Sequence, residues 1–155
     1  MSISDFIVVM KLGVVQQVGK PQEVYDNPTN LFVAKFLGTP PINVFTGKVQ
    51  SGKLYIGGDA GLDVAGVADQ DGYVGIRPEG FEPDAQGAFT CALSNIEVMG
   101  RDVSVVSTHE ASLNPVIRAI INADNKVDLS KVEVRFNLKP HKVFLFNKET
   151  EARIR

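Results

Sequence analysis

The chain has 155 residues, of which 44% are hydrophobic and 22% are charged, and its formal net charge is −2. This composition is typical of one globular domain, or of a small domain with an appendage, and it gives no positive field to attract nucleic acid. The one cysteine, Cys91, excludes an intrachain disulfide and a multi-cysteine metal site, and no apolar run reaches the roughly 18 residues of a membrane span. Because no secretory signal opens the chain, we expect a cytoplasmic protein.

The first forty residues begin with a predicted hairpin. Two β-favouring runs, residues 6–10 and 14–18, flank a short turn at Lys11-Leu12-Gly13. After them, the fixed φ of Pro21 suits the first position of a helical turn. The segment therefore predicts two strands followed by a short helix.

A second short helix is predicted after the first. We expect Asn27 to cap it, Pro28 to occupy its first position and Gly38 to end it in a left-handed conformation. Phe32 and Phe36 lie four residues apart on one apolar stripe of this connector helix. We therefore expect both rings to pack against the following domain or against a domain that is not part of this sequence.

The stretch TPP at residues 39–41 is a rigid break and the predicted domain boundary, so that residues 1–40 form a connector and residues 41–155 a second domain. Beyond it, many short runs rich in Val, Ile, Phe and Thr favour a small closed or nearly closed antiparallel barrel. Asp71-Gly72 predicts a hairpin turn. Residues 131–138 alternate between polar and apolar, which places four side chains on one face of a strand: Val132, Val134, Phe136 and Leu138.

The stretch GKVQSGKL at residues 47–54 contains the Gly-x-x-x-x-Gly-Lys skeleton of a phosphate-binding loop. Such a loop needs a Ser or Thr after the lysine to ligate magnesium, and a helix must follow it. Here Leu54 and a β-favouring run follow instead. We therefore interpret residues 50–53 as a turn between two strands, in which Gly52 supplies a positive φ.

No catalytic or cofactor motif is recognisable in the sequence. His109 and His141 lie in different β-favouring runs, neither has a metal or triad spacing, and no glycine-rich dinucleotide fingerprint occurs. Cys91 lies in an apolar run and is expected to be a buried, inert thiol. Aromatic residues make up 8% with no tryptophan, which argues against a stacking platform for single-stranded nucleic acid. The residues alone indicate a module that binds another molecule, with no cofactor and no enzymatic activity of its own.

Three stretches, in the same order, resemble the ATP-binding subunits of carbohydrate-type ABC importers, the maltose and glycerol-3-phosphate group. Residues 13–38 resemble the junction that follows the nucleotide-binding domain of those subunits. The stretch GIRPE at residues 75–79 resembles the Ile-Arg-Pro-Glu motif of their C-terminal regulatory, transport-associated OB domain, and residues 141–151 resemble its closing strand and turn. The resemblance implies an OB-like barrel over residues 41–155, preceded by the end of a nucleotide-binding domain over residues 1–40.

The chain also departs from the family pattern. Leu12 stands where the family has Asp or Asn, and Asn147 and Glu151 stand where Asp and Gly are common. The phosphate loop, the magnesium-binding carboxylate, the Leu-Ser-Gly-Gly signature and the switch histidine are not present in these 155 residues, and the resemblance places them upstream of residue 1. We therefore expect this chain neither to bind ATP specifically nor to hydrolyse it.

The resemblance implies a regulatory and dimerising role. In that family the domain pairs with its twin at the inner face of the membrane, beside nucleotide-binding domains and membrane subunits, and it can receive a regulatory protein or a small ligand. Arg77 and Glu79, which flank Pro78, are the candidates for orienting a partner, or else form a local ion pair. Asn43 is a candidate for tying the linker to the barrel, or for contacting a ligand.

Two other functions stay open from the sequence. The first is a stand-alone sensor domain that binds a sugar or an oxyanion in a concave site. The second is an OB-type nucleic-acid binder, against which the net negative charge and the few aromatic residues argue. The charge is uneven, since residues 59–102 carry nine acidic and two basic residues and residues 126–155 carry eight basic and four acidic ones. These patches would either support contacts between subunits or form ordinary solvated faces.

Overall fold

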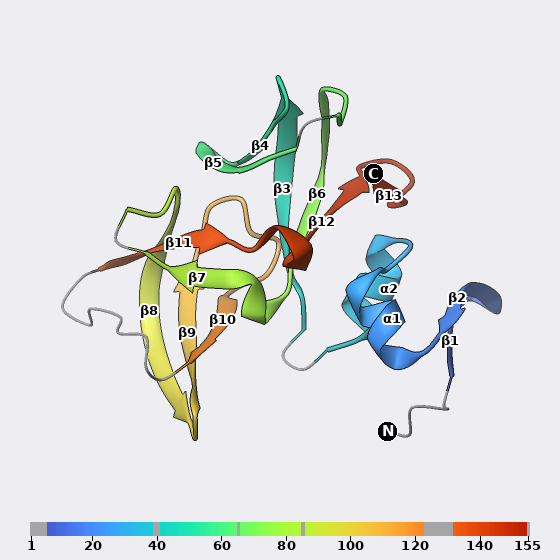
Figure 1. Ribbon diagram of the computed structural model, residues 1–155, viewed down its shortest axis with the longest axis horizontal. Coiled ribbons are helices and arrows are strands. Elements are labelled where there is room, and N and C mark those ends of the chain that lie inside the picture. Colours follow the sequence, from blue (N-terminus) through green and yellow to red (C-terminus); the bar gives the residue numbers. More distant parts are fainter. Residues whose placement is uncertain (1–5, 39–40, 65, 85, 123–131, 155) are drawn as a thin grey trace.

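The structure, a computed structural model, describes residues 6–38, 41–64, 66–84, 86–122 and 132–154. The chain is mainly β, with a hairpin and two short helices followed by two sheets that together form a nearly closed barrel (Figure 1). This confirms the fold class that the sequence predicts. None of the helices in the described ranges is long and apolar enough to cross a membrane.

The predicted hairpin is present. Strands β1 (Ile7–Lys11) and β2 (Val14–Gly19) pair in an antiparallel two-stranded sheet. Leu12 and Gly13 link them with φ values of +50° and +79°, the left-handed pair that a tight hairpin turn requires. Leu12 is 95% exposed and adopts a conformation that a branched side chain disfavours, so the departure from Asp or Asn at this position strains the turn.

The two helices follow as α1 (Pro21–Asp26) and α2 (Leu31–Phe36). The predicted cap at Asn27 is wrong, because the backbone N–H of Asn27 closes the end of α1 instead. Asn30 caps α2, with its side-chain oxygen accepting a hydrogen bond from the Val33 N–H at 2.9 Å. The helix therefore begins three residues later than predicted.

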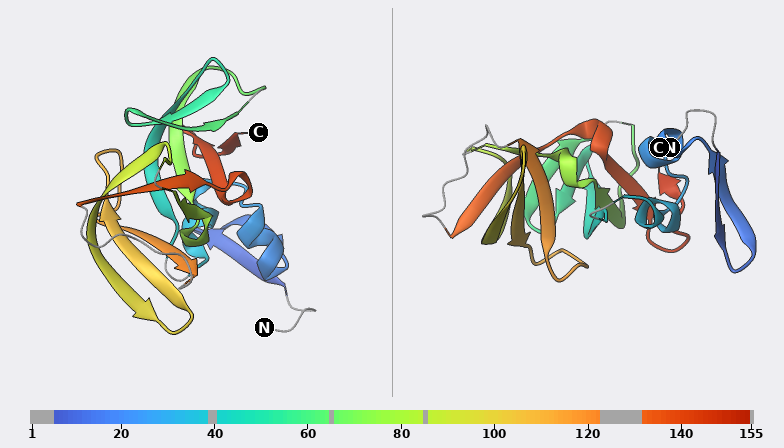
Figure 2. Two further views of the ribbon diagram at one scale, coloured as in Figure 1. Left: turned by 60° about the vertical axis from the view of Figure 1, so that its left-hand side comes forward. Right: turned by 90° about the horizontal axis from the view of Figure 1, so that it is seen from below.

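In the described part of the chain, eleven strands and two 3₁₀ turns build the barrel after the helices. One sheet has the strand order β10-β9-β8-β11-β7 and the other the order β13-β12-β6-β3-β4-β5, and the neighbours in both pair antiparallel. Figure 2 shows the barrel at one end of the molecule and the helices and hairpin at the other. The bounds are β3 (Asn43–Gln50), β4 (Lys53–Ile56), β5 (Asp59–Asp63), β6 (Gln70–Ile76), η1 (Pro78–Gly80), β7 (Phe81–Pro83), β8 (Phe89–Met99), β9 (Asp102–Thr108), β10 (Ile117–Asn122), β11 (Glu133–Leu138), η2 (Pro140–Lys142), β12 (Val143–Asn147) and β13 (Arg153–Ile154).

The core of the barrel is filled by aliphatic and phenylalanine side chains from both sheets, with the Cys91 thiol buried among them as expected. In β11, Val134, Phe136 and Leu138 point inward in alternation, which confirms the predicted face. Val132 is 85% exposed instead, because the strand begins only at Glu133. The alternation of burial along β11 is the period-two pattern of a strand with one face on the core.

One predicted turn is confirmed and another is wrong. Ser51 and Gly52, with φ values of +52° and +74°, turn the chain from β3 into β4, so the phosphate-loop skeleton is a hairpin. Asp71-Gly72 lies inside β6 and makes no turn. A side chain at Gly72 would bring its Cβ within 2.6 Å of the Phe146 carbonyl oxygen. The glycine is therefore needed for the close pairing of β6 with β12.

Candidate functional site

Arg77 is the centre of a contact between the barrel and the two helices. It follows the last residue of β6, and its side chain is fully buried although it is a cation. Its Nη1 donates to the carbonyl oxygens of Ala34 and Leu37, both at 2.9 Å, and its Nη2 donates to the carbonyl oxygen of Tyr25 at 2.8 Å. These are carbonyls at helix C-terminal ends, which lack partners within the helix and carry partial negative charge.

Tyr25 completes this contact from the side of the helices. The Arg77 guanidinium carbon lies 3.9 Å from the centre of the Tyr25 ring, a stacked cation–π geometry. The Tyr25 hydroxyl donates to the Glu79 carboxylate, with oxygen–oxygen distances of 2.7 and 2.8 Å. Burial, and then the hydrogen bond to Glu79, raise the pKa of the Tyr25 phenol above its ordinary value, so the hydroxyl stays protonated and keeps donating.

The charges around this contact are balanced by neighbours from three elements. Burial lowers the pKa of the Arg77 guanidinium, and the nearby Glu79 and Asp26 carboxylates oppose that shift. Lys142 Nζ lies 3.8 Å from an Asp26 oxygen and 3.7 Å from a Glu79 oxygen. No ion pair joins Arg77 directly to Glu79 in the described part of the chain. Both residues instead contact Tyr25: Arg77 contacts its ring and its backbone carbonyl, and Glu79 accepts a hydrogen bond from its hydroxyl. We call Tyr25, Arg77 and Glu79 the clamp.

Pro78 and Asn43 support the clamp from within the barrel. Pro78 occupies the first position of η1, where its fixed φ and missing N–H cost nothing, and it is buried. Asn43 is 3% exposed, and its Nδ2 donates to the carbonyl oxygens of Ile76 and Arg118 while its Oδ1 accepts from the Arg118 N–H. One amide side chain thus joins the start of β3 to β6 and β10.

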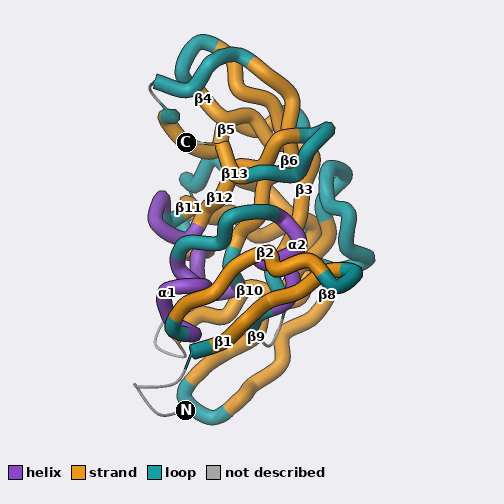
Figure 3. Tube along the Cα trace, turned by 90° about the vertical axis from the view of Figure 1, so that its right-hand side faces the viewer, coloured by secondary structure: helices purple, strands orange, loops and turns teal. Residues whose placement is uncertain are grey.

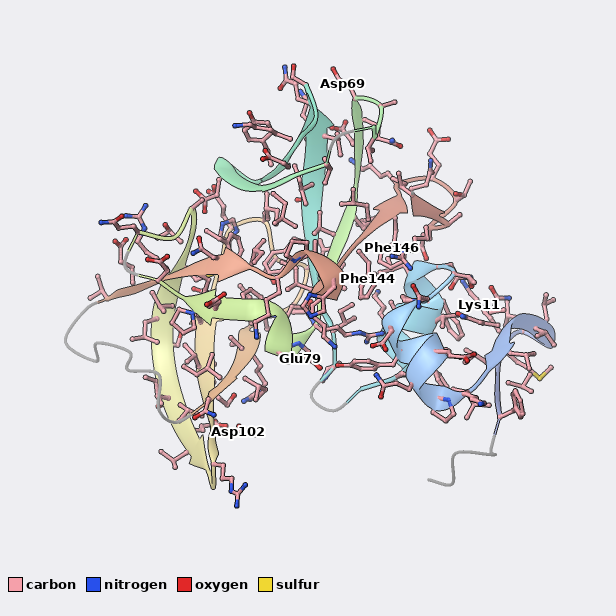
Figure 4. The ribbon with its side chains drawn as sticks, in the orientation of Figure 1. Lys11, Asp69, Glu79, Asp102, Phe144 and Phe146 are labelled. Atoms are coloured by element: carbon pink, nitrogen blue, oxygen red, sulfur yellow. The ribbon has the colours of Figure 1, made fainter. Side chains whose placement is uncertain are left out.

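The connector helix packs on the barrel with Leu31 and Ala34, so of the two contacts expected for Phe32 and Phe36 the one with another domain stays a prediction. Leu31 and Ala34 pack in one cluster with Phe144 and Phe146 of β12, both labelled in Figure 4. Phe36 is 60% exposed. Phe32 is partly buried, and it packs with three side chains of the hairpin and helices: Val9, Val24 and Val33. The face of α2 that packs against the barrel is therefore opposite to the face that carries Phe32 and Phe36.

The outer face of the hairpin is apolar and uncovered by the described residues. Val8, Met10, Val15 and Val18 share this face, because the register pairs Val8 with Val18 and Met10 with Val15, and each is at least half exposed. Phe6, just before β1, is 65% exposed. Figure 3 shows β1 and β2 lying in front of the two helices, so that this face looks away from the barrel. An apolar surface of this kind marks a site of contact with another protein or domain.

The titratable groups of the described residues form no cluster of the kind that holds a metal ion. No group of three or more His, Cys, Asp or Glu side chains among those residues is placed to hold a metal ion. His109 accepts a hydrogen bond from the Ala111 N–H on Nδ1, so its proton resides on Nε2, which donates to Asp59 at 3.2 Å. Its ring packs against Phe89, with 4.7 Å between ring centres. This histidine therefore has a structural role.

Sequence reasoning identified two members of the clamp and missed the third. Arg77 and Glu79 stand out through the GIRPE stretch, whereas Tyr25 lies more than fifty residues away and was not singled out. The only signal for Tyr25 in the sequence is its place between Val24 and Asp26, inside the first stretch that carries the family resemblance. The acceptors of the Arg77 side chain are backbone carbonyls, which no sequence motif can mark.

Known proteins match this chain over nearly its whole length. No family model matches the chain. An sn-glycerol-3-phosphate import ATP-binding protein of Jannaschia is 30% identical over 99% of the chain, and a sulfoquinovosyl glycerol transport ATP-binding protein of Agrobacterium fabrum is 33% identical over 99%. An oligosaccharides import ATP-binding protein of Bacillus subtilis is 30% identical over the full chain. The chain spans 43%, 45% and 46% of the lengths of these three relatives, as their C-terminal part. It belongs to the family of ATP-binding subunits of sugar-type ABC importers, as the counterpart of their C-terminal part.

Proposed function

We propose that this chain is the regulatory and dimerisation module of an ATP-binding subunit that serves a sugar importer. In this proposal residues 41–155 pair with a second copy, and residues 1–40 connect the barrel to a nucleotide-binding domain. The assembly works in the cytoplasm against the membrane subunits of the transporter. The module itself does not bind or hydrolyse ATP, because the motifs for both are not in its sequence.

The clamp is the observation that carries this proposal. Three hydrogen bonds from Arg77 fix the ends of both helices to the barrel, and the buried ring of Phe144 lies 5.7 Å from the same guanidinium. A rigid contact of this kind transmits a movement of the helices to the barrel, whereas a flexible linker does not. The apolar outer face of the hairpin supports the same reading, because it offers a surface on which a nucleotide-binding domain would sit.

A chimera tests the proposed function. The C-terminal 43% of the Jannaschia relative is replaced by this chain, and ATP hydrolysis and the molar mass in solution are measured. We expect a dimer that hydrolyses ATP, whereas the 155-residue chain alone hydrolyses none. The control is the same relative cut at the junction with nothing added. A chimera that is monomeric, or no more active than the cut relative, would contradict the proposal.

A further inference from the structure

The barrel has an open seam between the two edge strands of the five-stranded sheet. Strands β7 and β10 are the outer strands of that sheet, and the sheet curls until their Cα atoms come within 8 Å of each other. Figure 1 shows both strands beside η1. No hydrogen bond joins β7 to β10 within the described ranges. The five-stranded sheet therefore stops one ladder short of closing on itself at this point.

The edge of β10 presents backbone polar groups to this seam. Both backbone groups of Arg118 bond to the Asn43 side chain, so they point away from the neighbouring strand β9. Backbone groups alternate in direction along an antiparallel strand. The N–H and C=O of Ile120, two residues further on, therefore point to the same side, beyond the end of the Asn43 amide.

The edge of β7 also presents backbone N–H and C=O groups to the seam. Gly80 accepts from Lys139, and Asp84 donates to Arg135, so these residues bond to β11. By the same alternation, the N–H and C=O of Phe81 and the C=O of Pro83 point away from β11, toward β10. A buried backbone group without a partner is costly, so groups at such a place are normally bonded to water or to a ligand.

A cavity of about 210 Å³ lies at this seam. Its rim carries two carboxylates, Glu79 and Glu82, and one ammonium group, Lys139, and Figure 4 labels Glu79 where this region meets the helices. Neither Glu82 nor Lys139 belongs to an ion pair among the described residues. The remaining lining is mostly apolar: Phe81, Pro83, Ile120, Ile121 and Asn122.

These groups select one class of occupant. Hydrogen-bond acceptors outnumber donors at the seam. The acceptors are two carboxylates and three backbone carbonyls, and the donors are two backbone N–H groups and one ammonium group. A ligand that fits therefore donates many hydrogen bonds. The rim carries a net charge of −1, which disfavours phosphate and other oxyanions, and Lys139 disfavours an amine. A peptide strand does not fit, because inserting one would need about two strand spacings, roughly 9.5 Å, between β7 and β10.

We propose that the seam between β7 and β10 binds a small uncharged polyhydroxylated molecule of monosaccharide size. Hydroxyl groups bond to the carboxylates and to the free backbone groups, while ring C–H groups lie against the apolar lining. This ligand site goes beyond the proposed dimerising role and does not depend on it.

Glu79 connects this site to the helices. Its carboxylate accepts the Tyr25 hydroxyl, yet its side chain is still 41% exposed and lines the cavity. A ligand hydroxyl that bonds to Glu79 shares these oxygens with Tyr25. Occupancy of the seam therefore weakens one bond of the clamp, and by reciprocity the clamp weakens binding.

Amide NMR spectra of the 155-residue chain test the site, with glycerol, D-glucose and D-galactose as probes. Inorganic phosphate and ethanolamine serve as the charged comparisons. We expect at least one neutral probe to shift the Phe81 and Ile120 amides, and Glu82→Gln to weaken that binding about tenfold. Glu133→Gln, an exposed change on β11 away from the cavity, should leave it unchanged. No shift with any neutral probe, or shifts of these amides only with phosphate or ethanolamine, would overturn the proposal.

A separate variant tests whether Glu79 couples the ligand site to the helices. Tyr25→Phe removes the competing hydroxyl and should tighten binding of the same probe about fivefold. An unchanged dissociation constant would refute the connection and leave the site itself standing. Because these measurements need no nucleotide-binding domain and no dimer, their outcome is independent of the chimera experiment.

Discussion

The guanidinium of Arg77 lies over the ring of Tyr25, with 3.9 Å between its carbon and the ring centre, while two of its nitrogen atoms bond to backbone carbonyls of both helices. One side chain thus ends two helices and anchors them to the last residues of β6. Only arginine has a planar fork with enough donors to serve three carbonyls and an aromatic face at once.

Arg77→Lys should therefore destabilise the chain strongly. Lysine supplies one point charge, so it loses at least one of the three hydrogen bonds and the stacking, and it leaves a buried charge poorly matched. We expect the free energy of unfolding in urea to fall by about 2–4 kcal/mol. Arg118→Lys is the matched control, because the Arg118 side chain pairs with Glu97 at the surface and its loss should cost less than about 1 kcal/mol. Equal losses in the two variants would contradict the clamp.

Tyr25→Phe should cost about 1 kcal/mol at pH 7, because it removes one hydrogen bond to a partly exposed carboxylate. The loss should depend on pH. The pKa of the Tyr25 phenol is raised in the folded state by burial and by Glu79, so above pH 10 the unfolded chain releases a proton that the folded chain keeps. The contribution of Tyr25 is therefore full below pH 10 and falls as pH rises above it.

Urea unfolding of the wild type and of Tyr25→Phe between pH 8 and pH 11 measures this dependence. The difference in stability between them should narrow above pH 10, by at most about 1.4 kcal/mol per pH unit and by less because solvent reaches part of the ring. A difference that stays constant or widens would show that the phenol does not hold its proton through Glu79.

Asn43→Asp should open the barrel at β10. The substitution keeps the shape of the side chain but replaces the donating Nδ2, which bonds to the Ile76 and Arg118 carbonyls, with a carboxylate oxygen. Burying that charge against two carbonyls should cost about 3 kcal/mol. Amide exchange should accelerate in β10. The control Asn95→Asp, at an exposed position of β8, should change neither the free energy of unfolding nor the exchange in β10. Normal stability of Asn43→Asp would rule out the bridging role.

Leu12→Asn should stabilise the chain by about 1 kcal/mol, because asparagine tolerates the left-handed backbone that leucine disfavours. Leu12 has φ +50° and is almost fully exposed, so the change removes no packing. The control is Leu113→Asn, because Leu113 is 54% exposed and does not have a positive φ. We expect no gain in stability from this substitution. The thermal midpoint of each variant measures the effect, and a decrease for Leu12→Asn would contradict the strain.

Local patterns predicted the elements, and long-range packing decided the details. The hairpin turns at Gly13 and Gly52 and the alternation of β11 are local signals, and each appears as predicted except that β11 begins after Val132. Asp71-Gly72 has the same local signature as a turn, but pairing with β3 and β12 draws it into a strand. Phe36 is exposed because barrel residues distant in sequence, Phe144 and Phe146, determine which face of α2 is buried.

The candidate site was predictable only in part for the same reason. The GIRPE stretch marks Arg77 and Glu79 through resemblance, and Asn43 is marked by its position after the prolines. Their partners are backbone carbonyls and a tyrosine from other segments. The seam of the barrel depends on how far the five-stranded sheet curls, which no local pattern records.

Amide hydrogen exchange in the wild type and in Arg77→Lys tests most directly whether one arginine makes the helices and the barrel a single unit. In the wild type, the amides of α1 and α2 should be protected nearly as well as those of β3 and β6. In the variant, the helices should lose far more of that protection than the two strands, whose protection should fall only by the global loss of stability. Helices that exchange freely in the wild type, or that stay protected in Arg77→Lys, would contradict the account.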